Sequence, residues 1–300
     1  MSTTAQARVK GVLFSLSAGI LWGFVPVYIH FLGDVDPLEI VAHRSLWSLV
    51  MLCGVVTWRR QISMALEVLF NKKLLINFTI TTCLLSANWT IYVCAVQSGH
   101  VASAALGYFI YPICAVLLGI TIFRERLDRW AWLAICCVLI GVLVKAFLIA
   151  AVPWVALLVA LTFSLYAVMR KRLKIGPVLG LFVETLMLLP VTIGFLAWLT
   201  WSGHSIFFGG DAMFVFLAML AGVLTVVPLI LFHVGNRLLS VTTGSLLFYS
   251  NPTTQLLLAI LLFGEAFTAR DLLAFGPIWL GIVMYFVTRP KLAHTALSTG

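Results

Sequence analysis

Charged residues are scarce in this chain. Asp, Glu, Lys and Arg make up 10% of its 300 residues, and hydrophobic residues make up 62%. A soluble domain has roughly a quarter of its residues charged. The chain therefore lacks the polar residues needed to cover a globular surface in water. No stretch between its apolar runs is long enough to bury a core, which excludes a separate soluble domain.

Several catalytic and channel motifs are also missing. There is no G-x-x-x-x-G-K-[ST] loop, so the chain has no ATPase of its own, and no H-E-x-x-H zinc motif. No paired carboxylates indicate an enzyme, and no repeated filter-like segment indicates an ion channel. We therefore expect no enzymatic activity, metal or cofactor. The six cysteines have no C-x-x-C or metal-ligand spacing and are typical of buried small hydrophobic residues: Cys53, Cys83, Cys94, Cys114, Cys136 and Cys137.

The sequence instead contains apolar runs of about 20 residues, the length that crosses a bilayer. The first run is longer than a signal-peptide core and no cleavage site is evident after it, so we expect a retained helix. The segment from Arg59 to Lys73 is too polar to span and is expected to lie flat on the membrane surface. The runs predict an all-α membrane protein with ten spans: 11–32, 38–57, 74–96, 101–123, 130–149, 153–169, 177–201, 212–234, 241–263 and 270–288.

The net charge of +9 is concentrated in short clusters between the runs. With a cytoplasmic N-terminus, the cytoplasmic side receives 16 Lys and Arg residues and the opposite side receives only Lys145 and Arg270. Cytoplasmic loops of membrane proteins carry this excess. The clusters thus predict both termini in the cytoplasm and contact with anionic lipid, rather than binding of nucleic acid.

A shift of 140 residues aligns the two halves of the chain. It places Pro112 on Pro252 and Gly141 on Gly281. The predicted repeats are residues 9–149 and 153–290, and each holds five spans. Because five is odd, the second repeat is expected to be inverted in the membrane. Inverted repeats allow alternating access to a central site, which favours a secondary transporter over a channel or an enzyme.

Particular segments resemble a known family. They are HRSLWS (43–48), ANW (87–89), LGYFIYP (106–112), RERL (124–127), MRKRL (169–173), ETLMLLP (184–190) and the FYSNPT segment followed by FGE (263–265). These segments resemble the drug/metabolite transporter superfamily in its two-EamA-domain form, and within it the RarD permeases. The resemblance implies a ten-helix permease with a cavity between two EamA repeats and with helices 5 and 10 at the periphery. It leaves the substrate open. Tyr111 departs from the family pattern, which has Asn there, and this difference could alter a polar contact in the cavity.

Ionisable side chains inside a bilayer are costly and are candidates for function. Arg44 could attract a carboxylate or orient polar substrate atoms, or it could extend to the outer interface. Glu184 could receive an amine or carry a proton, or it could be a protonated or helix-capping acid. Their backbones are expected to be about 12 Å apart along the membrane normal, so we expect each to face one vestibule of a shared cavity. His43 could act on substrate or pair with Glu39 one turn earlier.

Aromatic and amide side chains inside the spans could line the same cavity, and aromatic residues can instead form interfacial belts. The predicted substrate-binding set is Trp22, His43, Arg44, Trp47, Asn88, Trp89, Tyr108, Tyr111, Glu184, Tyr249 and Asn251.

Prolines within spans remove backbone hydrogen bonds and can create bends. The hinge candidates are Pro26, Pro112, Pro228 and Pro252. Ser15, Gly19 and Gly23 share one helix face, which favours close helix approach or simple static packing.

Two acidic residues, Glu125 and Glu265, follow the fourth span of each repeat. We expect them to fix that loop to the N-terminus of the next helix.

These observations together predict an inner-membrane permease that exports a small organic metabolite or drug by alternating access. Protons are the candidate coupling ion. The alternative from another class is an integral-membrane enzyme or lipid-handling protein with a site at the membrane interface.

Overall fold

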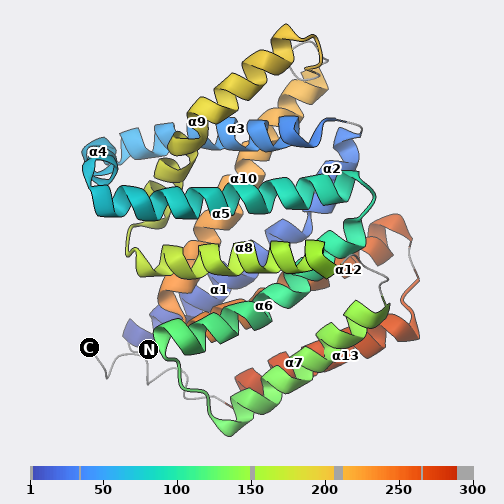
Figure 1. The fold of residues 1–300 in the computed structure, drawn as a ribbon. Helices are drawn as coiled ribbons and strands as arrows, with labels where there is room; N and C mark the ends of the chain where they lie inside the picture. The colour runs from blue at the N-terminus through green and yellow to red at the C-terminus, as the bar shows by residue number, and fades with distance from the viewer. Residues whose placement is uncertain (1–2, 34, 149–152, 206–211, 265, 289–300) are drawn as a thin grey trace.

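The computed structural model describes residues 3–33, 35–148, 153–205, 212–264 and 266–288, and every regular element in these ranges is a helix (Figure 1). Within these ranges, ten helical stretches are long and apolar enough to cross a membrane, which confirms the predicted all-α membrane fold. The predicted spans agree within several residues, with the largest difference at the first, which begins at Gln6. The helices are α1 (Thr3–Gly23), α2 (Val25–Leu32), α3 (Pro37–Trp58), α4 (Ile62–Phe70), α5 (Lys72–Gln97), α6 (Val101–Phe123), α7 (Arg129–Leu148), α8 (Pro153–Arg172), α9 (Pro177–Trp201), α10 (Ala212–Leu238), α11 (Val241–Leu247), α12 (Ser250–Phe263) and α13 (Ala269–Val287).

The spans define two sides of the bundle because each crosses it once. We call the end where α1 and α9 begin side A; it lies to the left in Figure 1. Helices α8 and α10 end at side A. Helices α2, α5 and α7 end at the opposite end, side B, and α6 and α13 begin there.

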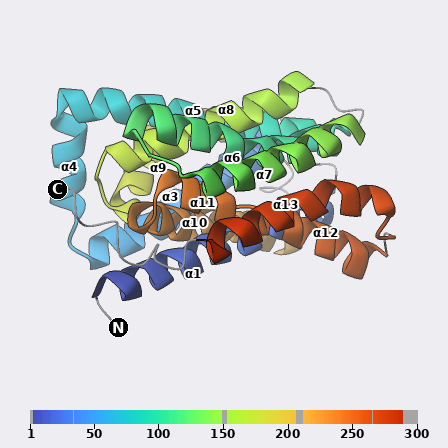
Figure 2. The same cartoon turned by 90° about the horizontal axis from the view of Figure 1, so that it is seen from below.

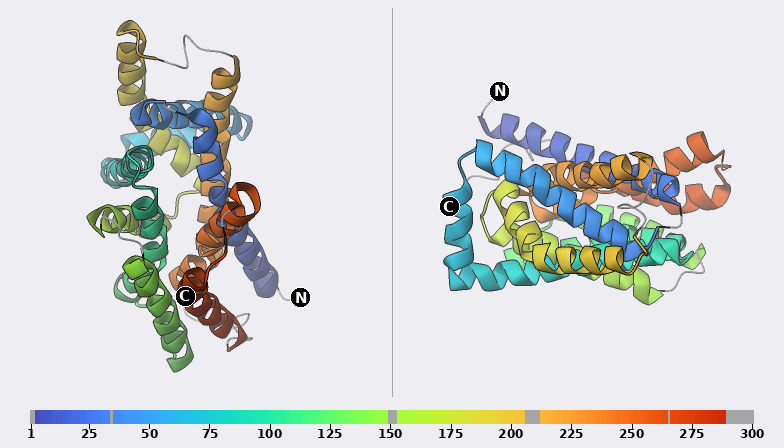
Figure 3. Two further views of the ribbon diagram at one scale, coloured as in Figure 1. Left: turned by 90° about the vertical axis from the view of Figure 1, so that its right-hand side faces the viewer. Right: turned by 90° about the horizontal axis from the view of Figure 1, so that it is seen from above.

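Helix α4 is the short helix between the second and third spans. It lies across the side A end of the bundle, as Figures 2 and 3 show. Ala65 and Val68 are buried against the bundle, whereas Phe70 is 86% exposed. This one-sided burial is typical of a helix lying in the membrane interface, as expected for the polar segment between the two spans.

Two of the ten spans are interrupted near a proline. The first breaks at Phe24, between α1 and α2, and Pro26 lies at the start of α2. The ninth breaks between α11 and α12, and Pro252 lies in the first turn of α12. Proline cannot donate the backbone hydrogen bond of a continuing helix. Pro112 and Pro228, by contrast, lie inside the unbroken helices α6 and α10.

The small residues of α1 face the interrupted ninth span. A Cβ atom at Gly19 would lie 1.9 Å from Ser250 Oγ, and one at Gly23 would lie 2.5 Å from Thr254 Cβ. At the side A end, a Cβ atom at Gly235 of α10 would lie 2.2 Å from Ser15 Oγ. Close helix approach, which the spacing of Ser15, Gly19 and Gly23 favours, is therefore present.

Helices α7 and α13 lie side by side at one edge of the molecule (Figures 1 and 3), as expected for helices 5 and 10. A Cβ atom at Gly141 would lie 2.4 Å from the Ala274 carbonyl oxygen, and one at Gly281 would lie 2.5 Å from the Ala134 carbonyl oxygen. The 140-residue shift places Gly141 on Gly281 and Ala134 on Ala274, so the two contacts are equivalent. The two helices thus make reciprocal contacts through equivalent residues.

Replacing Gly141 or Gly281 by Ala should destabilise the protein by about 1–3 kcal/mol, because a methyl group would meet backbone that cannot rotate away. Thermal unfolding in detergent would measure the change. Gly276→Ala on α13 is the matched control, since its Cβ atom would find its nearest neighbour at 3.8 Å. Equal unfolding temperatures for Gly281→Ala and Gly276→Ala would contradict the prediction.

Candidate functional site

A wide cavity of about 510 Å³ lies in the side B half of the bundle, between α2, the end of α5, the start of α6, α12 and α13. Its wall is mainly aliphatic and includes Val27, Ile29 and Leu256. Polar side chains near the ends of spans also line the cavity: His30, and Lys145 and Asp271, whose Nζ and Oδ1 atoms form an ion pair at 3.5 Å. The volume falls within the range of pockets that hold small organic ligands.

A narrow pocket of about 30 Å³ lies deeper in the bundle. Tyr92 and Gln255 line both this pocket and the wide cavity, so the two are adjacent. One water molecule needs about 10–15 Å³ of such space, so the narrow pocket has room for a group of two or three non-hydrogen atoms. The residues around it come from both halves of the chain: Trp22, Val25, Arg44, Asn88, Trp89, Tyr92, Tyr108, Phe163, Leu229, Phe248, Asn251 and Gln255.

Arg44 is the one charged residue of the narrow pocket among those that the structure describes. Its Nε donates a hydrogen bond to Thr225 Oγ1 at 3.1 Å, and its guanidinium carbon lies 4.9 Å from the centre of the Trp89 ring. A guanidinium over an aromatic face is attracted by the electrons of the ring. Arg44 is therefore held inside the bundle by α10 and α5 and does not extend to the membrane surface.

Amide side chains line the same pocket. Asn88 Nδ2 donates to the Val159 carbonyl oxygen at 2.9 Å and to Thr162 Oγ1 at 3.0 Å, which joins α5 to α8. Gln255 Nε2 donates to Asn251 Oδ1 at 2.8 Å, one turn earlier on α12. These bonds fix the polar wall in a bilayer, where a polar group needs a partner.

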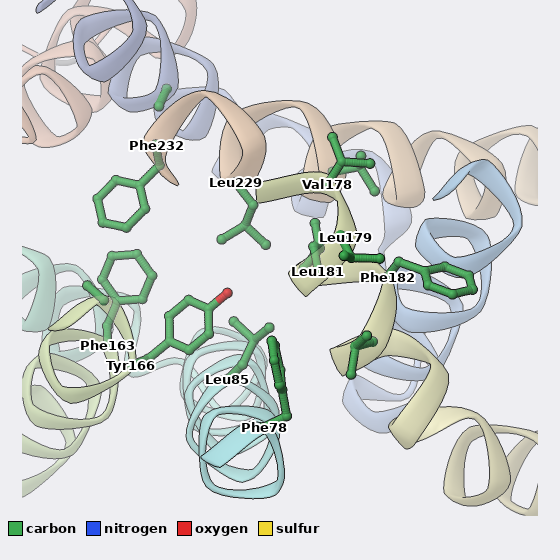
Figure 4. Close-up of a cluster of buried hydrophobic side chains, with 14 of the residues drawn as sticks. Phe78, Leu85, Phe163, Tyr166, Val178, Leu179, Leu181, Phe182, Leu229 and Phe232 are labelled. Atoms are coloured by element: carbon green, nitrogen blue, oxygen red, sulfur yellow. The ribbon is translucent and has the colours of Figure 1, made fainter. Parts of the chain in front are cut away.

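A layer of aromatic rings closes the narrow pocket toward side A. Trp22 lies 5.6 Å from Phe248, Tyr111 lies 4.7 Å from Phe248, and Phe163 stacks on Phe232 at 5.3 Å, between ring centres. Figure 4 shows Phe163 and Phe232 facing each other beside Tyr166. These spacings are those of aromatic rings in direct contact, and Tyr111, Phe232 and Phe248 are each only 1% exposed.

A buried ion pair lies beyond this layer, nearer side A. Arg170 Nε is 3.1 Å from Glu184 Oε1, and the two side chains are 1% and 0% exposed. Thr81 Oγ1 donates to Glu184 Oε1 at 2.7 Å, and the Tyr166 hydroxyl donates to Oε2 at 3.1 Å. The same hydroxyl is 2.9 Å from His233 Nε2. Helices α5, α8 and α9 therefore meet at one carboxylate, and α10 is joined to them through the Tyr166 hydroxyl.

Gly180 provides the room for the Arg170 side chain. A Cβ atom there would lie 2.0 Å from Arg170 Nη2. Because α9 begins at Pro177, both Gly180 and Glu184 are on its first turns and lie beside the end of α8.

The structure brings six of the predicted substrate-binding residues together around the narrow pocket: Trp22, Arg44, Asn88, Trp89, Tyr108 and Asn251. The other five lie elsewhere. Tyr111 lies within the aromatic layer and is 1% exposed. The Tyr249 hydroxyl points away from the narrow pocket and donates to the Phe109 carbonyl oxygen at 2.8 Å. Trp47 packs against Gly222 of α10.

The acidic and basic candidates have separate surroundings. His43 Nε2 lies 3.9 Å from Glu39 Oε1, which is the predicted structural pairing. Glu184 lines neither cavity and has its own cation in Arg170, so it makes no salt bridge with Arg44.

The expected role of Glu125 needs a correction. Its carboxylate accepts hydrogen bonds from the backbone nitrogens of Val241 at 2.6 Å and Thr242 at 3.1 Å. It therefore caps α11, in the other half of the chain, and not the next helix, because the loop after α6 folds back toward α11. Glu265 lies outside the described residues.

Sequence reasoning missed several residues of the site. Gln255 lies one helical turn after Asn251, and that i, i+4 spacing of two amides on one face could have indicated it. Arg170 belongs to a basic cluster that was assigned to the cytoplasmic side, and nothing in the cluster distinguishes it from its neighbours. Tyr166 and His233 lie within apolar runs, and nothing in the sequence distinguishes them from the other polar residues there.

Comparison with known proteins agrees with this architecture. The EamA-like transporter family matches residues 9–147 and again residues 151–287. An uncharacterized transporter of Vibrio cholerae is 33% identical, over 99% of this chain and 98% of the relative. Protein RarD of Escherichia coli is 30% identical, over 94% and 95%. A chloramphenicol-sensitive protein RarD of Pseudomonas aeruginosa is 33% identical, over 92% and 93%.

The fold is also similar to a known crystal structure, with a TM-score of 0.71 at 18% identity, covering 94% of this chain and 99% of the other. The ten spans and the bacterial relatives identify a multi-pass protein of the inner membrane. The repeated family match and the relatives that cover nearly the whole chain show that this chain belongs to the EamA-like transporter family, as a permease of the RarD type.

Proposed function

We propose that this permease is a secondary transporter that exports a small organic metabolite or drug by alternating access. The observation that carries the proposal is the path from the wide cavity to Arg44, which is closed toward side A by the aromatic layer and the Arg170–Glu184 pair. A site that lies toward one side and is closed toward the other is what one state of an alternating-access cycle requires.

The charge count assigns side A to the cytoplasm, because among the described residues 14 Lys and Arg residues lie at side A, against Lys145 and Arg270 at side B. On this assignment the conformation faces outward. Residues 9–149 and 153–290 would be the two inverted halves, and the reciprocal contacts of Gly141 and Gly281 support that relation.

The interruptions of the first and ninth spans are the proposed hinges. Both contribute to the pocket walls, through Trp22 and Phe248, and each lies next to a proline, Pro26 or Pro252. At both breaks the backbone hydrogen bonds change to the i→i−3 pattern, from Phe24 N to Leu21 O and from Tyr249 N to Leu246 O, each at 3.2 Å. Such a local change in a helix is typical of a hinge. Pro112 and Pro228, in unbroken helices, are the second pair of hinge candidates.

The energy for transport would come from a proton gradient or from the gradient of an exchanged substrate. Glu184 is the proposed proton carrier because opening of side A would separate α8 from α9 and expose its carboxylate to the cytoplasm. In the present conformation, the carboxylate is fully buried.

Counterflow in proteoliposomes tests the transporter assignment. Cells that lack or overexpress the gene would first be screened with metabolites and antibiotics, chloramphenicol among them because one relative is named for it. Purified protein should then exchange labelled substrate for unlabelled substrate without chemical change. A chemically altered product would support the membrane enzyme instead, and flux that does not saturate would indicate a pore.

A further inference from the structure

We infer that the site selects an organic anion: the narrow pocket takes a carboxylate or a similar planar anionic group, and the wide cavity takes the apolar body attached to it. The inference rests on the proposed transport function and names its substrate class. Its structural basis is the position of Arg44 in a very small pocket that adjoins a much larger, mainly apolar cavity at Tyr92 and Gln255.

Arg44 has no anionic partner among the residues that the structure describes. Its contacts are a neutral hydroxyl, Thr225 Oγ1, and the face of Trp89. A cation inside a bilayer without an anion nearby is costly. A bound anion would remove that cost, whereas a neutral ligand would not.

The unused edge of the guanidinium suits a carboxylate. Thr225 accepts from Nε, and within the described chain no acceptor is bonded to the two terminal nitrogens. Those nitrogens carry parallel N–H groups that match the two oxygens of a carboxylate. Lysine would offer a similar charge but not this fork.

The two volumes divide the ligand into a head and a body. The narrow pocket beside Arg44, of about 30 Å³, admits a head group of two or three non-hydrogen atoms. The wide cavity, of about 510 Å³, admits the rest of the ligand. Tyr92 and Gln255 line both spaces and would contact the junction of head and body. The aliphatic wall, including Val27 and Leu256, favours an apolar body.

Cations and zwitterions have no corresponding place in the pocket. No carboxylate lines the narrow pocket in the described part of the chain. Asp271 in the wide cavity is engaged by Lys145 and by the Thr268 hydroxyl, which donates to it at 2.7 Å. An ammonium group would therefore meet Arg44 without compensation.

Three probes with one body test the selectivity: 4-phenylbutyrate, its neutral amide 4-phenylbutyramide, and the cation 4-phenylbutylamine. Quenching of tryptophan fluorescence in the purified full-length protein would report binding, since Trp22 and Trp89 line the narrow pocket. The acid should bind at least about tenfold more tightly than the amide, as expected for a charge-assisted hydrogen-bonded pair. The amine should bind most weakly.

Arg44→Gln should make the acid and the amide bind alike, and Arg44→Lys should retain only part of the preference. Arg172→Gln, a change of an exposed arginine at side A, is the control and should leave the ratio unchanged. If Arg44→Gln does not fold, the comparison of the three probes on the unaltered protein decides alone. Equal or tighter binding of the amide or amine, or binding of none of the three, overturns the inference.

Counterflow separates this inference from the transport proposal. Exchange of a neutral or cationic substrate that the acid does not displace would leave the transporter standing and remove the anion assignment. Tight binding of the acid with no flux of any anion would support the assignment and remove the transporter.

Discussion

Replacement of Arg170 by Met should lower the free energy of unfolding by about 3–5 kcal/mol, because Glu184 would remain buried as a charge without its cation. Thr81 and Tyr166 would still donate to the carboxylate, but two neutral donors do not compensate for the loss of a full charge. Unfolding of the purified protein in detergent would measure the loss, and the yield of folded protein in membranes should fall with it.

The double variant Arg170→Met/Glu184→Met separates the pair from either residue alone. Removing both charges from an apolar site often restores stability, so most of the loss should be recovered. Arg172→Met replaces an exposed side chain two residues later on α8. It should change the free energy of unfolding by no more than about 0.5 kcal/mol. Equal losses in Arg170→Met and Arg172→Met would show that the ion pair is not a major source of stability.

The double variant also bears on transport. If the pair holds side A closed, the double variant should fold and yet transport more slowly, since two apolar side chains would not separate readily into a water-filled vestibule. Unchanged counterflow would limit the pair to a structural role.

Much of the fold was accessible from the sequence because the bilayer imposes a length. Each span needs about 20 apolar residues, and few other structures use such runs. The polar wall of the pocket was accessible for a related reason. Arg44, Asn88 and Asn251 are polar residues inside spans, and polar groups in lipid must find a partner.

The direction in which neighbouring side chains point was not accessible. Residues two apart on a helix differ by about 200°, and Tyr249 and Asn251 accordingly lie on opposite sides of their span. One contacts Phe109 and the other lines the pocket. Choosing between them requires knowing which helix lies on each side, and a hydrophobic run carries no such signal.

Arg170 illustrates the same limit in a basic cluster. Arg170, Lys171 and Arg172 are alike as orientation signals, yet Arg170 is 3% exposed and Arg172 points outward. The selection depends on Gly180 and Glu184 of α9, which approach the end of α8 only after the chain has folded. The sequence therefore indicated a buried acid in Glu184 without its partner.

Ala259→Cys, in a variant whose own six cysteines are replaced, should react completely with a membrane-impermeant thiol reagent added to intact cells. Ala259 lines the wide cavity in the side B half of the ninth span. Ser245→Cys on the same span should stay unreacted, because Ser245 is 1% exposed and lies toward side A. The two positions are separated by up to about 21 Å along the span, so one helix carries both the test and its control.

The pattern of labelling would decide orientation and closure separately. Reaction of Ala259→Cys only in inside-out vesicles would place side B in the cytoplasm and reverse the assignment made from the basic residues. Reaction of Ser245→Cys at the same rate would mean that the aromatic layer and the Arg170–Glu184 pair do not seal the bundle. A transported substrate should slow the labelling of Ala259→Cys, because it fills the wide cavity and draws the protein toward the opposite state. An impermeant reagent reaches only the state open to its own side, so slower labelling on the outside must be matched by new reactivity from the cytoplasm if the two halves alternate.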